Sequence, residues 1–293
     1  MSLIVMGSVN HDLTIDVAEF PGPGETILAR GTQTATGGKS ANQAVAGALA
    51  GVPVQIVARC GADPAGELAR ADLEEAGVDT TLLTPAEAQT GTALIHLRQD
   101  GENTITVIPG ANTLLTSKDC PDQALGGARW LLLSLEVPLS TVLESAARAR
   151  SAGVKVALNL SPSPVQPVSL AEVDLVIVND GEARTLLGAS PDELPDPAGS
   201  AGLETLVVTH GPRGASVYTA GTPSPVTVPG VPVRAVDTTG CGDAFAGVLV
   251  ARLSAGDSML AALDWATAFA AEAATRPGAQ SSYPRDFVPA GQS

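Results

Sequence analysis

The stretch Leu175-Val176-Ile177-Val178-Asn179-Asp180-Gly181-Glu182 carries the pattern from which the fold can be predicted. Its apolar, β-branched start predicts a buried strand, and Gly181 to Leu187 predict a helix that begins directly after it. Five further apolar runs predict parallel strands at Leu3 to Met6, Val54 to Val57, Trp130 to Leu133, Val154 to Leu158 and Leu206 to Thr209. Helical patterns lie between them, at Ser40 to Ala50, Ala65 to Ala76 and Ser140 to Ser151. This alternation predicts an α/β fold, a three-layer α/β/α sandwich with helices on both faces of the sheet.

Two stretches interrupt the alternation, Leu13 to Ala35 and Thr92 to Ile108. Both have strand patterns without crossover helices, and the second is typical of a hairpin around Gln99-Asp100-Gly101-Glu102. We expect them to form a small β-sheet lid, from about residues 13–36 and 92–109, inserted in a single domain spanning residues 1–293 and placed over a site at its edge. The alternative is that these strands extend the main sheet.

Composition excludes several classes of protein. The 293 residues carry a formal charge of −15, which opposes nucleic-acid binding because that depends on clustered Lys and Arg. A nucleotide site would have to use local backbone amides, a few basic side chains and metal ions. Cys60, Cys120 and Cys241 lie far apart, without zinc spacing or a disulfide framework. With no signal-peptide pattern and no run of membrane-spanning length, we expect a cytoplasmic protein that contacts no membrane.

The strongest local motif is Val236-Asp237-Thr238-Thr239-Gly240-Cys241-Gly242-Asp243-Ala244-Phe245. A β-prone stretch, Val231 to Val236, leads into glycines and then into a helical pattern. Glycines allow close backbone approach, and unpaired amides at a helix start attract anions, so the run predicts an anion hole for a phosphoryl group. Asp243 at the same place could take the proton from an attacking hydroxyl. The alternative is that Asp243 is an ordinary helix cap.

Further polar residues follow the predicted strands. Gly37-Gly38-Lys39-Ser40-Ala41-Asn42 is not a P-loop, because Gln33 stands where that motif requires glycine. It indicates a glycine turn that exposes its backbone to a small polar ligand and presents Asn42 on the next helix, or else a plain turn capped by Ser40. Asn10 and Asp12 alternate along an extended chain, so both can grip vicinal hydroxyls. Glu136 also follows a strand, but each of these signals is weak alone.

Two more motifs predict a phosphate-binding edge. Asn179-Asp180-Gly181-Glu182 offers oxygen atoms near which Mg²⁺ and phosphates could bind, although acidic residues are favoured at any helix start. Thr209-His210-Gly211-Pro212-Arg213-Gly214 supplies another glycine turn after a strand. Ligands of open α/β sheets bind at the carboxyl ends of the strands, where all these motifs are expected.

In their order and spacing, the motifs resemble those of the ribokinase-like carbohydrate kinases of the phosphofructokinase-B type, over nearly the whole chain. Gly7 to Asp12, Gly37 to Ala44, Asn179-x-x-Glu182, Thr209-x-Gly211-x-x-Gly214 and Asp237 to Asp243 carry the resemblance, supported by Gly110-Ala111-Asn112, Leu135-Glu136, Asn159 to Pro162 and Thr275 to Gln280. The resemblance implies an α/β/α domain with a β lid, through which two chains often pair as a homodimer. It also implies ATP, Mg²⁺ and a monovalent cation such as K⁺ as cofactors.

Site residues follow from the resemblance position by position. It implies that the sugar is bound by Asn10, Asp12, Gly38, Lys39, Asn42 and Glu136, with Asp243 as the base beside an anion hole of Gly240, Cys241 and Gly242. The nucleotide, its phosphates and Mg²⁺ would lie against Asn179, Glu182, Thr209, Gly211, Gly214, Gly242 and Thr267. The monovalent cation would lie at Asp237, Thr239, Ala273, Arg276, Gly278 and Ser282. Ser40 and Cys241 depart from the Gly and Ala that are common in the family.

The implied activity is phosphorylation of the primary hydroxyl of a sugar by ATP, with D-ribose giving D-ribose 5-phosphate as the first expectation. Fructose, a deoxy-ketoacid sugar or a nucleoside are alternative acceptors for the same fold. Aromatic residues make up only 3% of the chain, which leaves little material for stacking a nucleoside base. A second alternative is a non-catalytic sugar-binding protein, but such a protein is expected to have lost Asp243 or its flanking glycines.

Overall fold

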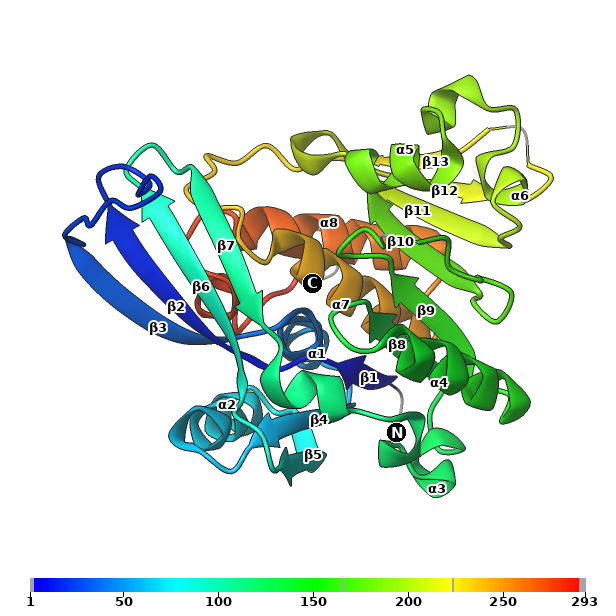
Figure 1. Cartoon of the computed structure of the whole chain (residues 1–293). Helices are drawn as coiled ribbons and strands as arrows, with labels where there is room; N and C mark the ends of the chain where they lie inside the picture. The colour runs from blue at the N-terminus through cyan, green and yellow to red at the C-terminus, as the bar shows by residue number, and fades with distance from the viewer. Residues whose placement is uncertain (1–2, 165, 223, 290–293) are drawn as a thin grey trace.

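A computed structural model describes residues 3–164, 166–222 and 224–289 as two β-sheets with helices on both faces of the larger one (Figure 1). Within these residues the larger sheet has nine strands in the order β13-β12-β11-β10-β9-β8-β1-β4-β5. They are β1 (Leu3–Gly7), β4 (Val54–Gly61), β5 (Asp79–Ala86), β8 (Trp130–Ser134), β9 (Lys155–Asn159), β10 (Leu175–Asn179), β11 (Thr205–Thr209), β12 (Gly214–Thr219) and β13 (Val226–Pro229).

The larger sheet is parallel from β11 to β5, and β12 and β13 extend it antiparallel at one edge. All six strands predicted from apolar runs are present, which confirms the predicted fold class. Strands β5, β12 and β13 were not predicted from the sequence. Strands β5 and β13 lie at the sheet edges and are partly exposed, so their sequences lack a continuous apolar run. Strand β12 is buried, but its run is interrupted by Ser216, which hydrogen-bonds His210 and Thr227.

Alternate residues of the central strands point into two separate apolar cores. On β1, Leu3 and Val5 face one core, whereas Ile4 and Met6 face the other. The first core lies under α1 (Lys39–Leu49), α2 (Pro64–Glu75), α7 (Cys241–Ala255) and α8 (Met259–Ala273). The second lies under α3 (Asp122–Leu125), α4 (Leu139–Ser151), α5 (Asp180–Leu187) and α6 (Pro197–Ser200). Short 3-10 turns are η1 (Gly110–Leu114), η2 (Ser117–Asp119), η3 (Pro191–Glu193), η4 (Gly211–Arg213) and η5 (Gln280–Ser282).

Helices α1 and α7 pack closely because Gly247 faces the α1 backbone. A Cβ added at Gly247 would lie 2.2 Å from the carbonyl oxygen of Gln43. This close approach brings the first turn of α7 beside the first turns of α1, where Asn42 and Gln43 lie. Among the helices of the described residues, none is long and apolar enough to cross a lipid bilayer.

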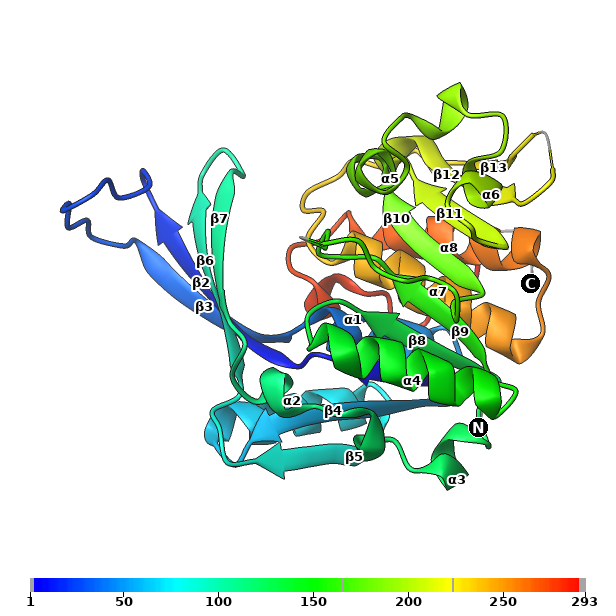
Figure 2. The ribbon, with the colours of Figure 1, turned by 45° about the vertical axis from the view of Figure 1, so that its right-hand side comes forward.

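The smaller sheet stands out from the body of the protein (Figure 2). Its order is β3-β2-β6-β7, formed by β2 (Asn10–Val17), β3 (Gly31–Gly37), β6 (Gly91–Arg98) and β7 (Asn103–Ile108). The predicted separate small sheet is thereby confirmed, and the alternative that these strands extend the main sheet is wrong. Strand β2 begins at Asn10, three residues earlier than predicted, and Asn10 pairs with both Gly37 and Gly91. The base of the small sheet therefore lies next to the carboxyl end of β1.

Candidate active site

Asp243 lies in the first turn of α7 with its side chain turned toward α1. Asp243 is only 7% exposed, and its two carboxylate oxygens accept hydrogen bonds from Asn42 Nδ2 (3.0 Å) and Gln43 Nε2 (3.2 Å). The N-cap residue of α7 is Gly240, whose φ of 72° suits glycine, and α7 has no side-chain cap hydrogen bond. The interpretation of Asp243 as an ordinary helix cap is therefore wrong, because its carboxylate bonds to another helix. Instead it is a buried acid held by two amides.

Charges around Asp243 set its protonation. Burial is the main cause that raises the pKa of Asp243, and the charge of Glu136 raises it further. The nearby Lys39 and the amide donors of Asn42 and Gln43 lower this pKa, but they do not outweigh burial. For Lys39, burial lowers the pKa, but the carboxylates of Asp243, Glu136 and Glu182 together outweigh burial and raise it. A buried carboxylate with a raised pKa beside a cation is suited to exchange a proton with a bound hydroxyl.

Asn10 and Glu136 are fixed by neighbours at the base of the small sheet. Asn10 is 3% exposed, and its Oδ1 accepts a hydrogen bond from Asn112 Nδ2 at 2.7 Å. Glu136 Oε2 accepts from Ser8 Oγ at 2.7 Å and from the backbone amide of Lys39 at 3.0 Å. Each thus presents a remaining polar atom in a held orientation. Sequence analysis gave no role to Asn112, although it noted the motif that contains it.

The glycine turn before α1 brings the backbone against β2. Gly38 has φ 91°, and a Cβ there would lie 2.9 Å from the Asn10 amide nitrogen. Gly38 begins the helix without a side-chain cap, and Ser40 Oγ instead hydrogen-bonds Ser134 Oγ at 3.0 Å. The alternative that Ser40 caps the helix is therefore wrong. The turn is buried against the backbone of residues 8–10, and its role in binding a small polar ligand stays a prediction.

Asp12 has an unsatisfied oxygen in this group. Its Oδ1 is buried and has no hydrogen-bond partner among the described residues. Burial, followed by the charges of Glu136 and Asp243, raises the pKa of Asp12 to about 7. Buried polar atoms without partners are rare in folded proteins, so this oxygen is suited to a ligand that brings its own donors. Sugar hydroxyls are such donors.

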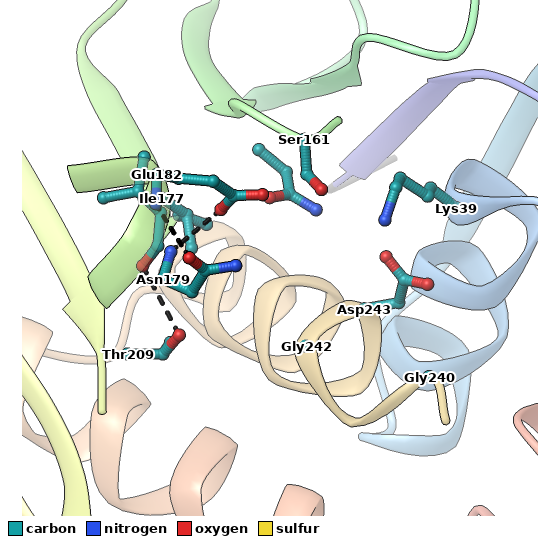
Figure 3. A pocket seen from close by; sticks show the side chains of 11 residues that line it. Lys39, Ser161, Ile177, Asn179, Glu182, Thr209, Gly240, Gly242 and Asp243 are labelled. Atoms are coloured by element: carbon teal, nitrogen blue, oxygen red, sulfur yellow. Dashed lines mark hydrogen bonds between the residues drawn. The ribbon is translucent and has the colours of Figure 1, made fainter. Parts of the chain in front are cut away.

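A polar cavity extends from Asp243 toward the carboxyl ends of β9 and β10 (Figure 3). The Lys39 amino group and the Asp243 carboxylate point toward one another in it. The other side chains that line it include Asn159, Ser161, Asn179, Glu182 and Thr209. Sequence analysis assigned no role to Asn159 or Ser161, because a polar residue after a strand is a weak signal without the fold.

Asn179 and Glu182 are paired with each other at the start of α5. Asn179 Oδ1 accepts from the Glu182 amide and Glu182 Oε2 accepts from the Asn179 amide, both at 2.9 Å. This reciprocal capping box occupies one oxygen of each side chain. Glu182 Oε1 remains available, so the oxygen chemistry of the pair fits a hydrated Mg²⁺.

An apolar cavity adjoins the polar one. It is lined by residues from Thr209 to Gly214, from Gly230 to Cys241 and from α7 and α8, including Gly211, Gly214 and Thr267. Thr267 Oγ1 is buried and has no hydrogen-bond partner among the described residues. The stretch Val231 to Val236, predicted to be β-prone, forms no strand. It forms part of this cavity wall, where Pro232 has no amide hydrogen for a sheet ladder.

Thr209 and Gly242 line both cavities and so mark their junction. Within the part of the chain that the structure describes, the Gly242 and Asp243 amides have no hydrogen-bond acceptor, whereas the Cys241 amide donates to Thr238 O at 3.2 Å. A Cβ added at Gly242 would meet no atom within 4 Å. The free amides of this helix start are thus those of Gly242 and Asp243, and space for an anion lies beside them.

The Asp237 carboxylate lies on the other side of this turn and is held by three hydrogen bonds. Asp237 accepts hydrogen bonds from the Thr239 amide (2.9 Å), Thr239 Oγ1 (2.7 Å) and the Gly278 amide (2.8 Å). Burial alone would raise the pKa of Asp237, but these bonds outweigh it and lower the pKa. The Arg276 guanidinium donates from Nη1 to Ser282 O at 3.4 Å, and the Arg276 backbone amide donates to Ala273 O at 3.2 Å. The Ala273 and Ser282 carbonyl oxygens thus already accept hydrogen bonds from Arg276, and the Asp237 carboxylate is the anionic oxygen group here that suits a hard cation.

Comparisons with known proteins agree with this geometry. Residues 1–286 match the pfkB family carbohydrate kinases. A ribokinase from Haemophilus influenzae is 36% identical over 295 residues, covering 97% of this chain and 95% of the relative. A deoxyribokinase from Salmonella typhi is 32% identical, with 97% and 96% covered. The structure of Arabidopsis thaliana ribokinase complexed with ribose and ATP superposes with a TM-score of 0.88, at 29% identity and with 97% and 96% covered. The chain is therefore a member of the pfkB family of carbohydrate kinases.

Proposed function

We propose that this protein transfers the γ-phosphoryl group of ATP to the primary hydroxyl of D-ribose, giving D-ribose 5-phosphate and ADP. The observation that carries the proposal is the junction of two cavities at Gly242. The apolar cavity suits an adenine, and the polar cavity ends at a buried acid. ATP that spans the junction would bring its terminal phosphate to Asp243.

The sugar would bind at the base of the small sheet. Asp12, with its unpartnered buried oxygen, would accept hydrogen bonds from sugar hydroxyls. Asn10, Asn42 and Glu136 would add polar contacts, and the turn at Gly38 would let the backbone approach the sugar. This arrangement supports a small polyhydroxylated acceptor, because the side chains that surround it are amides and carboxylates.

Asp243 would remove the proton of the attacking hydroxyl. The hydroxyl oxygen forms a bond to the γ-phosphorus, the bond to the bridging oxygen of ADP breaks, and the proton goes to the Asp243 carboxylate. The amides of Gly242 and Asp243 would stabilise the negative charge on the transferred phosphoryl group by hydrogen bonds. The positive charge of Lys39 would stabilise the same group from across the cavity. The small sheet, as a lid, would exclude water from the reaction.

Two ions would assist. Mg²⁺, held through Glu182, Asn179 and the phosphates, would neutralise charge on the nucleotide. A monovalent cation at Asp237, Thr239, Ala273, Arg276, Gly278 and Ser282 would stiffen the turn that carries the anion hole. The first assignment is supported by the Glu182 carboxylate, of which the capping box uses only Oε2, and the second by the Asp237 carboxylate, which is held beside Gly278.

A coupled ADP-release assay tests the proposed function. We expect the highest kcat/KM with D-ribose among D-ribose, 2-deoxy-D-ribose, D-fructose, a 2-keto-3-deoxy sugar acid and adenosine, with activity dependent on Mg²⁺ and raised by K⁺. 2-Deoxy-D-ribose belongs in the panel because a deoxyribokinase is among the relatives. Preference for adenosine would refute the sugar assignment, and ribose binding without ADP release would indicate a non-catalytic protein.

The small sheet would also pair two chains as a homodimer. Every residue of its edge strand β7 is exposed, including the apolar Ile105, Val107 and Ile108. Apolar residues gathered on an edge strand favour an interface. Light scattering should give about twice the chain mass of 29.4 kDa, and Ile105→Asp should shift the mass toward the monomer. A monomeric wild type would refute the pairing.

A further inference from the structure

The segment that follows α8 contacts the reaction centre at two points. Gln280 Nε2 donates to Asn42 Oδ1 at 2.9 Å, and the Tyr283 hydroxyl donates to Gly240 O at 2.8 Å. The two residues lie within four positions of one another on and after η5 (Gln280–Ser282). Their partners belong to α1 and to the turn before α7, which are far away in the chain. One short segment thus joins the partner of the candidate base to the candidate anion hole.

The Asp243 carboxylate sets which way the Asn42 amide faces, and Gln280 completes that orientation. The Asp243 carboxylate can only accept hydrogen bonds while it is ionised, so Asn42 must turn its Nδ2 toward it. Asn42 Oδ1 then faces away and needs a donor, which Gln280 supplies. Without that donor, Asn42 Oδ1 would lose its hydrogen bond, and Asn42 would be held against Asp243 from one side only. Gln280 therefore completes the hydrogen-bonded chain from Gln280 through Asn42 to Asp243.

Tyr283 fixes the turn that carries the free amides. Its side chain is buried and its ring packs edge-on against Phe269, which holds the hydroxyl against Gly240 O. A Cβ on Gly240 would lie 2.7 Å from Ala279 Cβ, so the turn rests directly on this segment. The orientation of the Gly240 carbonyl sets the first peptide plane of α7. The Gly242 and Asp243 amides follow in that first turn.

We propose that Gln280 and Tyr283 are positioning residues, which hold Asn42 against Asp243 and the Gly240 carbonyl beneath the anion hole, without touching either substrate. This inference rests on the proposed kinase activity. Because neither group would contact ATP or sugar, their loss should act on turnover through Asp243 and the helix-start amides. Loss of Gln280 should also weaken sugar binding, since Asn42 would hold the sugar.

Steady-state kinetics of Tyr283→Phe, Gln280→Met and Gln280→Glu, at saturating Mg²⁺ and K⁺, test the proposal. Losing one buried donor typically lowers a rate by about tenfold. We expect Tyr283→Phe to lower kcat by about that factor with the KM for ribose within about twofold of wild type. Gln280→Met should lower kcat and raise the KM for ribose. Gln280→Glu should be worse than Gln280→Met, because a carboxylate offers Asn42 Oδ1 no donor.

Matched controls separate positioning from stability. Tyr218→Phe removes another buried tyrosine hydroxyl, which donates to Asp192 Oδ1 at 3.2 Å far from the site, and Ser281→Ala removes a hydroxyl from the same segment. Thermal unfolding of all variants should show similar losses for Tyr218→Phe and Tyr283→Phe, with kcat lowered only in the latter.

Unchanged kcat and KM in Tyr283→Phe and in both Gln280 variants, with an active wild type, would overturn the proposal. Equal loss of kcat in Tyr218→Phe would overturn it too, since a general loss of stability would then explain the effect. Gln280→Glu with wild-type kinetics would refute the role of Gln280 as a donor to Asn42. If the wild type itself released no ADP with ribose, the proposed function would fail before this inference.

Discussion

Asp12→Asn should make the protein more stable, and the gain should depend on pH. Burial, Glu136 and Asp243 raise the pKa of Asp12 from an ordinary 3.8 to about 7 in the folded protein. The folded state therefore holds the Asp12 proton more tightly than the unfolded state does. The stability that comes from this proton is complete below pH 3.8 and is lost as pH rises to 7.

The magnitude follows from the same values. At about 1.36 kcal/mol per pH unit, the shifted pKa of Asp12 costs the folded state about 4 kcal/mol at pH 8, where Asp12 is mostly ionised in the site, and about 1.6 kcal/mol at pH 5, where it takes up a proton on folding. An asparagine does not titrate, so its contribution to the free energy of unfolding is the same at pH 5 and pH 8. The advantage of Asp12→Asn over wild type should therefore grow by about 2–3 kcal/mol between pH 5 and pH 8.

Urea unfolding of both proteins at pH 5 and pH 8, without ligand, measures this difference. Asp16→Asn, the same substitution further along β2, controls for the loss of a carboxylate from the small sheet. Equal free-energy changes for Asp12→Asn at the two pH values would refute the reasoning. Asp12→Asn should also lose affinity for ribose, which would link the stability cost of Asp12 to its role in sugar binding.

Three further outcomes test other parts of the site. Gly242→Ala should not lower the melting temperature, because the added methyl meets no atom within 4 Å, but it should raise the KM for ATP about tenfold by entering the phosphate path. Thr267→Val should leave stability unchanged or higher, because it removes a buried hydroxyl without a partner among the described residues, and should weaken ATP binding in calorimetry. Cys241 should be alkylated about 100-fold more slowly than an exposed cysteine at pH 7.5, as peptide mapping can measure, because burial, with Asp237 and Asp243, raises its pKa to about 11. A wild-type KM for ATP would contradict the prediction for Gly242→Ala, and unchanged ATP affinity the one for Thr267→Val. Rapid labelling would contradict the prediction for Cys241.

The sheet could be predicted from sequence because its central strands are buried on both faces. Runs such as Leu175 to Val178 must be apolar at every position, which leaves a continuous signal. Strand β12, Gly-Ala-Ser-Val-Tyr-Thr, is also buried but has no such run, since Ser216 is buried through hydrogen bonds to His210 and Thr227. Val231 to Val236 has strand-like residues, yet it forms the wall of a cavity, because what packs against a segment decides its structure more than its propensity does.

The site was predictable only where a residue type and its chain position were both informative. Asp243 follows glycines at a helix start, and that local pattern suggests its chemistry. Gln280 ends the stretch Thr275 to Gln280 that supports the resemblance, but that stretch indicates no role for it, and Tyr283 lies outside it. Their contacts join residues 238 and 43 positions apart. Such contacts depend on the packing of α1 and α7 beside the last segment. The capping box between Asn179 and Glu182 was not predicted either, because the motif was interpreted as a pair of ligand residues and not as two residues bonded to each other.

Turnover of Asp243→Asn with ATP and ribose tests the central claim most directly. The account predicts that kcat falls by roughly 10²–10⁴-fold, while ATP affinity measured by calorimetry stays close to wild type, because a general base is lost and the nucleotide cavities are kept. Turnover near that of the wild type would contradict the assignment of Asp243 as the group that takes the proton.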